Sequence, residues 1–448
     1  DRKRIYYGAN PSYKRRSMDA VIALYTAQLT PRFKWAAKVF FKNAMRLDLI
    51  IYTSEEAFTQ AEGIKVNYSP EIRQDAFNIS PHGLLWEHEI SDQEFYTSDW
   101  EGMPVFCQRQ IGDLPFDPLA AAFYLVSRYE EYLPFIPDEH GRFPAKESFA
   151  FSNGFLTRPL VGEWALVVGK HLLGADFELV QNYDYLTTVD IDNLFAYKGK
   201  GALRTIGALA KDLRNASFGK FKERLSTLFN LRRDPYDTFR KQRNWNKTHG
   251  IKAIYFMLFA PFGPKDRNVS PHSTEAAVKL REIADWSTVG IHPSYASNSD
   301  AEKVQNERVQ LQEVLRRPVM HSRQHYLRMR TPQTFRNLVD LGVNEEHSMG
   351  YTYTPGFRSS MACSYTFYDL EMEAELPLLI RPFAFMDITY AHLNPKEATE
   401  EMKQWIPSVK KVGGTLISVW HNRTFSEHEA QWKGWPETYK SFIHAAQP

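Results

Sequence analysis

The sequence has few cysteines and no long apolar segment. Cys107 and Cys363 are the only thiols among 448 residues and form no CxxC pair, which excludes a disulfide framework and weakly favours a reducing compartment. No apolar run is long enough to span a bilayer, and the charged start, residues 1–7, lacks the apolar core of a signal peptide. We expect a cytoplasmic protein, although the start at Asp1 rather than Met leaves open that a leader was removed.

An excess of charge of one sign is also missing. Lys and Arg total 55 against 53 Asp and Glu, so the balance identifies no charged partner, and we expect no nucleic-acid partner. A hydrophobic share of 43% excludes wholesale disorder. The length exceeds what one hydrophobic core usually organises, so we expect two domains, at residues 1–178 and 179–448. The sequence does not indicate an oligomeric state.

The first of these domains is predicted to be an α+β accessory domain of unknown role. Apolar residues at helical spacing predict helices over residues 17–28 and 33–46, and residues 46–53 have the character of a strand. A further helix is expected over residues 117–133, where Asp117 can cap its start, and another over 158–173. The polar residues that follow these helices favour a solvated surface over a site.

The second domain shows strands that alternate with helices. Strands are predicted over residues 185–192, 251–260, 287–294, 318–325, 342–348, 376–387 and 415–421. Helical periodicity occupies residues 236–248, 273–285, 300–316, 332–341 and 395–411. This alternation indicates parallel βα units, and so many in succession predict a barrel closed or nearly closed by its strands. In such a barrel the chemistry collects at the carboxyl ends of the strands.

Polar residues lie at those strand ends. Asp190 and Asp192 end the first strand, two residues apart, and therefore share one face of it. One acidic and two imidazole ligands describe a hydrolytic metal site, and Asp192, His292 and His325 form the natural set. The expected ion is divalent, with Zn²⁺ as the first choice.

The remaining polar strand ends suggest catalytic roles. Asp190 is predicted to be the general base that activates the attacking water, and His421 the acid that protonates the leaving group. Arg323 is expected to keep Asp190 ionised. His321 is more simply a structural residue.

These motifs resemble the NodB-type polysaccharide deacetylases, carbohydrate esterase family four, in a divergent bacterial branch with an N-terminal accessory domain. Thr188-Val-Asp-Ile-Asp-Asn193 resembles the first family motif, which holds the catalytic base and a metal ligand. Ile291-His-Pro-Ser-Tyr-Ala296 resembles the second motif, and Ile417-Ser-Val-Trp-His421 the last, which supplies the catalytic histidine. Ser322-Arg-Gln-His-Tyr-Leu327 stands where the arginine motif of the family is expected.

Further stretches extend the resemblance, namely Ser348-Met-Gly-Tyr351 with Gly356-Phe-Arg358 and, less specifically, Ser127-Arg-Tyr-Glu-Glu131 with Gly141-Arg-Phe143. The resemblance implies a distorted (β/α) barrel with seven strands, a zinc-like ion, and removal of N- or O-acetyl groups from a sugar. Aromatic and cationic residues near the mouth are candidates for binding that sugar: Tyr295, Tyr326, Tyr351, Arg358 and Trp420.

The sequence departs from the family at one metal ligand. The distal histidine of the second motif is replaced by Ala296, so we assign the third ligand to His325 from its place at a strand end. Glu346 and His347 are weaker candidates. The main hypothesis is a metal-dependent deacetylase of a bacterial glycan or glycolipid precursor, with an acetylated oligosaccharide or polysaccharide as partner. The alternative is a decayed domain that binds glycan without cleaving it.

A basic segment, about residues 198–247, interrupts the alternation after the first strand. It combines many Lys and Arg residues with Leu and Phe at helical spacing. The favoured interpretation is a solvated helical excursion packed by its own apolar stripe. The other is an amphipathic basic helix that lies on anionic lipid or phosphorylated glycan, which would give the protein peripheral membrane contact.

Overall fold

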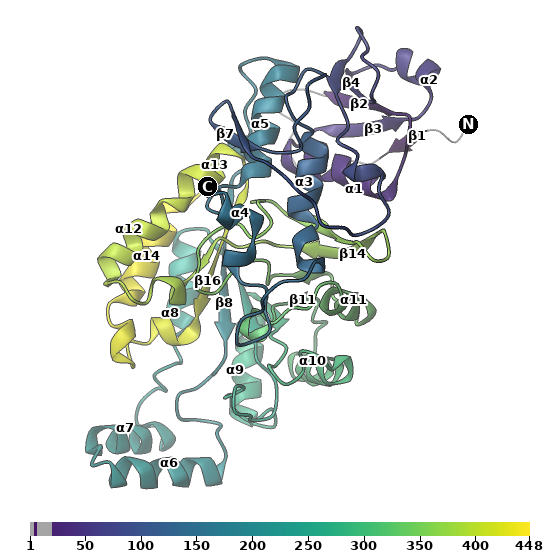
Figure 1. Ribbon diagram of the computed structural model, residues 1–448. Helices are drawn as coiled ribbons and strands as arrows, with labels where there is room; N and C mark the ends of the chain where they lie inside the picture. Colours follow the sequence, from purple (N-terminus) through teal and green to yellow (C-terminus); the bar gives the residue numbers. More distant parts are fainter. Residues whose placement is uncertain (1–3, 7–19) are drawn as a thin grey trace.

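The protein is a mixed α/β structure. The computed structural model describes residues 4–6 and 20–448 and contains a five-stranded, a nine-stranded and a two-stranded sheet (Figure 1). The five-stranded sheet and its helices belong to the first part of the chain and lie at the top of Figure 1, above the larger sheet. None of the helices in the described residues is both long and apolar enough to cross a membrane.

The five-stranded sheet has the order β1-β3-β2-β4-β5, and all its pairs are parallel except that of β1 with β3. Its strands are β1 (Arg4–Tyr6), β2 (Val21–Thr26), β3 (Asp48–Tyr52), β4 (Ile64–Tyr68) and β5 (Phe77–Ile79). The helices of this part are α1 (Pro31–Ala37), continued by a π-helix (Lys38–Ala44), α2 (Glu55–Thr59), α3 (Pro118–Val126), α4 (Phe149–Ser152) and α5 (Leu160–Leu173). The short strands β6 (Ser98–Trp100) and β7 (Met103–Val105) form the two-stranded sheet.

The helix predicted over residues 17–28 is wrong for residues 21–26, and residues 17–19 lie outside the described residues. Residues 21–26 form β2, which pairs with β3 on one side and β4 on the other. The run Val-Ile-Ala-Leu-Tyr-Thr is buried almost throughout, and periodicity cannot distinguish a fully buried strand from a buried helix. The other expectations for this part correspond to observed elements, except that the helix expected over residues 117–133 ends as α3 at Val126, before a left-handed Arg128 (φ 56°). The Asp117 carboxylate accepts the amides of Leu119 and Ala120 at 3.0 Å, as a cap should.

The nine-stranded sheet has the order β13-β14-β12-β11-β10-β9-β8-β16-β15. Only β13 and β14 pair antiparallel; the other neighbours are parallel. The strands are β8 (Asp184–Ile191), β9 (Lys252–Met257), β10 (Thr288–Ile291), β11 (His321–Ser322), β12 (Glu345–Glu346), β13 (Tyr365–Asp369), β14 (Ala374–Ile380), β15 (Phe385–Met386) and β16 (Thr415–His421). In the described part of the chain no pairing joins the two edges of this sheet, so closure into a seven-stranded barrel stays a prediction.

Helices follow most strands of the large sheet, as the sequence predicts. They are α6 (Ala202–Arg214), α7 (Phe218–Leu228), α8 (Phe239–Thr248), α9 (Thr274–Ala284), α10 (Ala301–Leu315), α11 (Gln333–Asp340), α12 (Pro395–Lys403), α13 (Trp405–Lys411) and α14 (Trp435–Ala445). Ile191, Met257 and Ile291, at one level of three neighbouring strands, are buried in a common hydrophobic cluster. Since side chains alternate along a strand, the residues on either side of this level face the opposite side of the sheet.

The two parts of the chain share one hydrophobic core. One buried cluster contains residues from Ile22 to Val168 together with residues from Met329 to Ile380, which include β13 and β14. The division into domains at about residue 178 stays a prediction, because this cluster contains residues from both sides of it.

A buried ionic network crosses the same boundary. The Glu131 carboxylate accepts hydrogen bonds from Arg128 Nε and Arg358 Nε, both at 2.8 Å, and none of the three side chains is more than 4% exposed. Arg128 also pairs with Glu130 at 2.6 Å. Burial raises the pKa of Glu131, but the guanidinium groups of Arg358 and Arg128 more than offset this and lower it to about 2.

Replacing Glu131 by glutamine should lower the free energy of unfolding by about 3 kcal/mol, because two buried guanidinium groups lose their shared counter-charge. The pKa of this carboxyl is lower in the folded protein, so its ionic stabilisation is present above about pH 4.5 and is lost as pH falls towards 2. The difference between the urea denaturation midpoints of wild type and E131Q should therefore become smaller below pH 4.5. The exposed Glu139→Gln is the control, and equal midpoints for E131Q and E139Q at pH 7 would contradict the assignment.

Candidate metal centre

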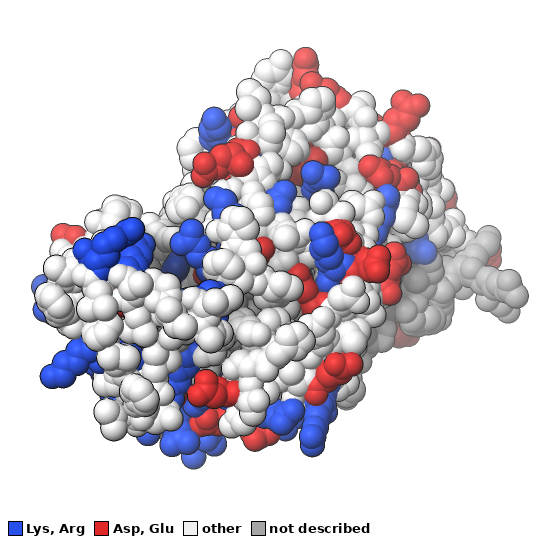
Figure 2. All heavy atoms as spheres, turned by 90° about the horizontal axis from the view of Figure 1, so that it is seen from below, with Lys and Arg blue, Asp and Glu red and all other residues white. Residues whose placement is uncertain are grey.

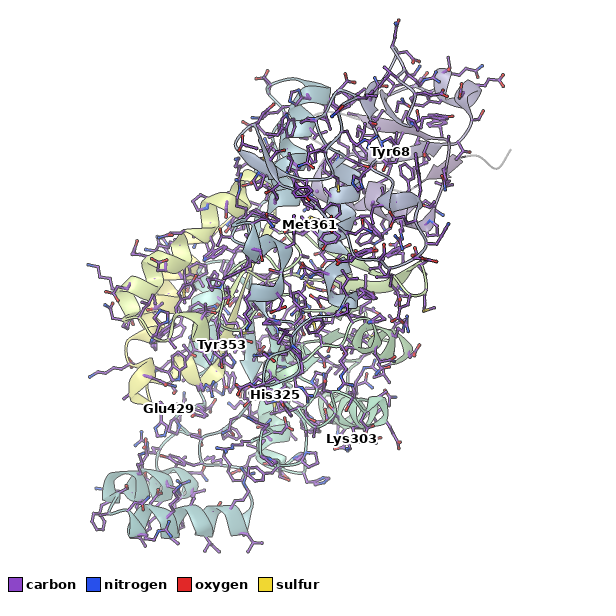
Figure 3. All side chains as sticks on the ribbon, viewed as in Figure 1. Tyr68, Lys303, His325, Tyr353, Met361 and Glu429 are labelled. Carbon is purple, nitrogen blue, oxygen red and sulfur yellow. The ribbon has the colours of Figure 1, made fainter. Side chains whose placement is uncertain are left out.

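Strand register brings the predicted site residues together at one end of the large sheet. Asp190 on β8 lies directly opposite His421 on β16. Ile291 on β10 pairs with Ser322 on β11, which makes His292 and Arg323 neighbours one residue further along. Figure 3 shows His325 at the end of the sheet from which the α6–α7 hairpin projects.

Three donor atoms converge at this end. Asp192 Oδ1 lies 3.5 Å from His292 Nε2 and 3.6 Å from His325 Nε2. Tetrahedral zinc with bonds of about 2.0–2.1 Å holds its ligands about 3.3–3.4 Å apart, so the spacing fits one ion. The two imidazoles are buried, and the Asp192 side chain is 23% exposed, which leaves the site open to a ligand on that side.

The hydrogen bonds of the two imidazoles decide which nitrogen faces Asp192. His292 Nδ1 lies 2.5 Å from the carbonyl oxygen of Arg323, and His325 Nδ1 lies 2.9 Å from the Asp266 carboxylate. Because both partners can only accept, each Nδ1 carries a proton, and Nε2, which bears the lone pair of a neutral imidazole, faces the Asp192 carboxylate in both rings.

Two imidazole lone pairs that face a carboxylate are repelled by its negative charge unless a cation lies among these atoms. Asp192 Oδ1 is buried and has no hydrogen-bond partner among the described residues, as expected of a ligand atom. Burial lowers the pKa of His292, yet the Asp190 and Asp192 carboxylates raise it above its usual value. Burial raises the pKa of Asp192, and the imidazoles of His421, His292 and His325 hold it well below its usual range. A proton or a metal ion placed among these atoms removes the repulsion, and the residues present fit a divalent ion.

Asp266 is a functional residue that sequence reasoning missed. It lies after β9, and its carboxylate accepts the amides of Tyr295 at 2.7 Å and Ala296 at 3.2 Å besides the bond to His325. The second motif, which has Ala296 in place of a histidine, therefore supplies backbone amides that hold the carboxylate orienting His325. The only sequence signal was an aspartate in a Pro- and Gly-rich turn, which many surface loops share.

The predicted base, Asp190, is buried beside Arg323. Arg323 Nε lies 3.5 Å from Asp190 Oδ1, and Arg323 Nη2 donates to Thr188 Oγ1 at 2.8 Å. Asp190 Oδ1 has no hydrogen-bond partner among the residues described, while Oδ2 lies 3.9 Å from His292 Nε2. The Arg323 guanidinium also contacts the ring of Phe256, 4.9 Å from its centroid. Oδ1 therefore faces Arg323, and Oδ2, on the side of His292, is the oxygen that can accept a proton.

The predicted acid, His421, is held by a second carboxylate that was not assigned a role. Asp387 Oδ1 lies 2.7 Å from His421 Nδ1, and its Oδ2 accepts the His421 amide and the hydroxyl of Thr424. His421 Nε2 therefore faces the site, 3.9 Å from Asp192 Oδ2. Burial lowers the pKa of His421, but the Asp387 and Asp192 carboxylates raise it to about 9, so the imidazole holds a proton to donate.

The proposed sugar-binding residues divide into two groups. Trp420 is fully buried, with its indole N–H on Ser418 and its ring against Tyr439 and Phe442, so its predicted stacking on a sugar is wrong. Tyr351 and Arg358 are also buried, and the Arg358 guanidinium is engaged by Glu131.

Tyr295 and Tyr326 lie near the centre, with their rings 5.3 Å apart. A loop of the first part holds them: His140 Nδ1 lies 3.3 Å from the Tyr295 hydroxyl, and Arg142 Nη1 donates to the carbonyl of Tyr326 at 2.7 Å. Tyr326 and Leu327 adopt left-handed backbone angles, φ 59° and 52°, which cost energy for residues with a Cβ. The Arg142 bond holds this turn, and the turn sets where His325 points.

His321, Glu345 and His347 form a separate polar group, which includes one weaker candidate for the third ligand. Their facing atoms lie 3.4–3.6 Å apart, but Arg381 already binds the Glu345 carboxylate at 2.9 Å. His347 Nδ1 is buried without an acceptor among the described residues, whereas metal-bound histidines donate that proton. Glu346 bonds to Ser348 instead and is not part of either group.

In comparisons with known proteins, a family model matches only the first part of the chain. Residues 22–176 match a family of unknown function, DUF7033. No curated protein matches the sequence.

Solved structures give a distant likeness. A structure described as a polysaccharide deacetylase from Mycobacterium smegmatis is 13% identical, with TM-score 0.37, over 60% of this chain and 84% of that one. A second so described, from Pseudomonas aeruginosa PAO1, is 11% identical, with TM-score 0.38, over 59% and 85%. A CE4 family pseudoenzyme from Bacillus anthracis is 10% identical, with TM-score 0.29, over 57% and 60%. TM-scores this low carry no argument about function, which rests on the residues of the site.

Replacing Asp266 by asparagine should weaken binding of a divalent ion about 10- to 100-fold, because the imidazole of His325 loses the carboxylate that orients it and raises its basicity. Isothermal titration of metal-free protein with Zn²⁺ measures this. The control is Asp285→Asn, whose side chain is 67% exposed and which precedes β10, at the opposite end of that strand from His292. Equal affinities in D266N and D285N would remove Asp266 from the site.

Proposed function

We propose that the protein is a metal-dependent hydrolase that removes acetyl groups from an N- or O-acetylated glycan. The observation that supports it most is the convergence of two imidazole lone pairs on the Asp192 carboxylate, flanked by an acid and a base. One carboxylate and two imidazoles around an open position are typical of hydrolytic metal centres. The sugar substrate follows from the resemblance of the sequence motifs to polysaccharide deacetylases.

The site offers distinct groups for each proton transfer. A divalent ion held by Asp192, His292 and His325 would supply Lewis acidity, which activates water and stabilises a developing oxyanion. Asp190 accepts the proton of the attacking water through Oδ2, which faces His292, while Arg323 holds Oδ1.

His421 completes the reaction from the other side of Asp192. Its Nε2 donates a proton to the departing amine or alcohol as the bond to the acetyl carbon breaks, and Asp387 holds the ring in the tautomer that presents this nitrogen. Water thus supplies the hydroxyl of acetate, and His421 supplies the proton of the amine. Tyr295 and Tyr326 provide aromatic surface near the site on which a sugar ring can stack.

A second candidate function is glycan binding without cleavage, which Ala296 favours because the family has a histidine there. Such a protein would bind acetylated oligosaccharides in the presence of a chelator and would release no acetate. The two functions therefore differ in their dependence on the metal ion.

Asp192→Ala should abolish both ion binding and acetate release, because it removes the ligand that both imidazoles face. Metal analysis of the purified protein and acetate release from a panel of acetylated oligosaccharides measure the two effects. Asp340→Ala, at the exposed end of α11, is the control and should leave both unchanged. Wild-type protein that holds no divalent ion, together with unchanged ion content in D192A, would exclude the proposal.

Asp387→Asn should separate chemistry from metal binding. The ion should stay bound, because Asp387 contacts His421 and none of the three ligands, while kcat falls about 10²- to 10⁴-fold as the acid loses its orientation. Metal content and initial rates are measured on the same sample, with D266N as the opposite case, in which affinity for the ion falls. Equal kcat in D387N and wild type would show that His421 is not the acid.

A further inference from the structure

A helical hairpin projects from the body of the protein beside the candidate site. It consists of α6 and α7 and occupies the connection between β8, which carries Asp190, and β9. Figure 1 shows it at the lower left, apart from the layers that cover the large sheet. None of the described hydrophobic clusters contains a residue of the segment 200–233.

Part of the hairpin is packed by its own apolar side chains, as expected of a solvated helical excursion. Leu209 on α6 and Phe221 and Leu225 on α7 are partly buried. The Asp212 carboxylate, itself buried, accepts a hydrogen bond from Arg224 at 2.8 Å and so ties the two helices together. This packing explains how the hairpin holds its shape.

A second set of apolar side chains remains exposed. On α6, Leu203, Ile206 and Leu213 recur at helical spacing and therefore share one face of the helix. These side chains and those around α7 are between 49% and 88% exposed: Leu203, Ile206, Leu213, Phe218, Phe229 and Leu231. Large apolar side chains gathered in this way mark an interaction surface.

Basic residues surround the exposed apolar ones. The segment 198–233 contains ten Lys and Arg residues and only two acidic residues, Asp212 and Glu223. Both acids are paired within the hairpin, with Arg224 and Arg232. The basic residues with exposed side chains are Lys211, Arg214, Lys220, Lys222, Arg232 and Arg233. Figure 2 views this end of the molecule, and its left part shows Lys and Arg around uncharged surface.

From this surface we infer that the α6–α7 hairpin docks on an anionic lipid bilayer. Apolar side chains inserted at the level of the headgroups, with Lys and Arg around them on anionic phosphates, are the features of an interfacial amphipathic helix. A nucleic acid would satisfy the cations but leave Leu203, Ile206 and Leu231 in water, so the apolar set favours lipid.

The base of the hairpin is fixed to the body, so docking sets the orientation of the whole protein. The buried Asp234 carboxylate accepts the amides of Ala196 and Tyr197 at 2.7 and 2.9 Å, which joins the two ends of the segment. Arg204 donates to the carbonyl of Asn268 at 2.9 Å. The hairpin follows the carboxyl end of β8, and therefore it projects from the same end of the sheet as Asp192. This step rests on the proposed function: the docked protein would turn its site toward the bilayer and act on a glycan carried by a lipid.

Flotation with lipid vesicles tests the docking. The full-length protein should float with phosphatidylcholine vesicles that contain phosphatidylglycerol, float at least tenfold less with phosphatidylcholine alone, and be released by high salt. The double variant Leu203→Ser, Ile206→Ser should bind the anionic vesicles at least tenfold more weakly. Both positions are exposed, so the fold should be kept, and unchanged metal content confirms it. Ile136→Ser, at a side chain 69% exposed in the first part, is the matched control and should float like wild type.

Three results would overturn the inference: wild-type protein that stays with the unbound fraction at low salt, equal flotation of the double variant and wild type, or a mobility shift of RNA without flotation. None of them depends on catalysis. Acetate release from soluble oligosaccharides by a protein that does not float would keep the proposed function and exclude the docking. Flotation without acetate release would keep the docking and exclude the proposed function.

Discussion

The site depends on one electrostatic constraint, which is that two imidazoles turn Nε2 toward the same carboxylate. The constraint originates outside the three residues. The Arg323 carbonyl and the Asp266 carboxylate each take the Nδ1 proton of a histidine, and this leaves Nε2 of both rings facing Asp192. Strand register adds Asp190 and His421 on either side, so a position that demands a cation is also within reach of a base and an acid. The large sheet, its helices and the loop that holds the turn at Tyr326 all serve to keep these five side chains in place.

Much of this arrangement could be predicted from the sequence, because parallel strands deliver their terminal residues to one edge. Asp192 and His292 each follow a buried strand, so their meeting needs no knowledge of loops, whereas the direction of His325 depends on the turn after β11. Asp266 and Asp387 could not be found in the same way, since an aspartate in a turn looks the same whether it orients a histidine or faces water. Burial misled the prediction twice. Residues 21–26 are buried so completely that their strand has no period-2 signal, and Trp420 belongs to the apolar packing of β16 although it directly precedes a site residue.

The hairpin shows a related limit of sequence patterns. Its composition indicates an amphipathic, basic pair of helices, but the choice between self-packing and an external surface depends on how many apolar residues the packing uses. Leu209, Phe221 and Leu225 pack the two helices together, and the apolar residues beside them on the same stripes stay exposed. Self-packing uses only part of each apolar stripe, so both interpretations hold for the same helices.

The shared core also has a consequence for how the chain is made. The first part leaves the ribosome early, yet its buried cluster includes Met329, Tyr365 and Ile380. Its apolar surface therefore cannot be fully covered until synthesis has passed β14, which follows the whole first half of the large sheet. During this interval α1 and α3, which pack against Tyr365 and Tyr368, lack part of their apolar partner, and nascent chains in such a state are prone to aggregation. The protein therefore has a long period of synthesis in which part of its first core stays open to contacts with other chains.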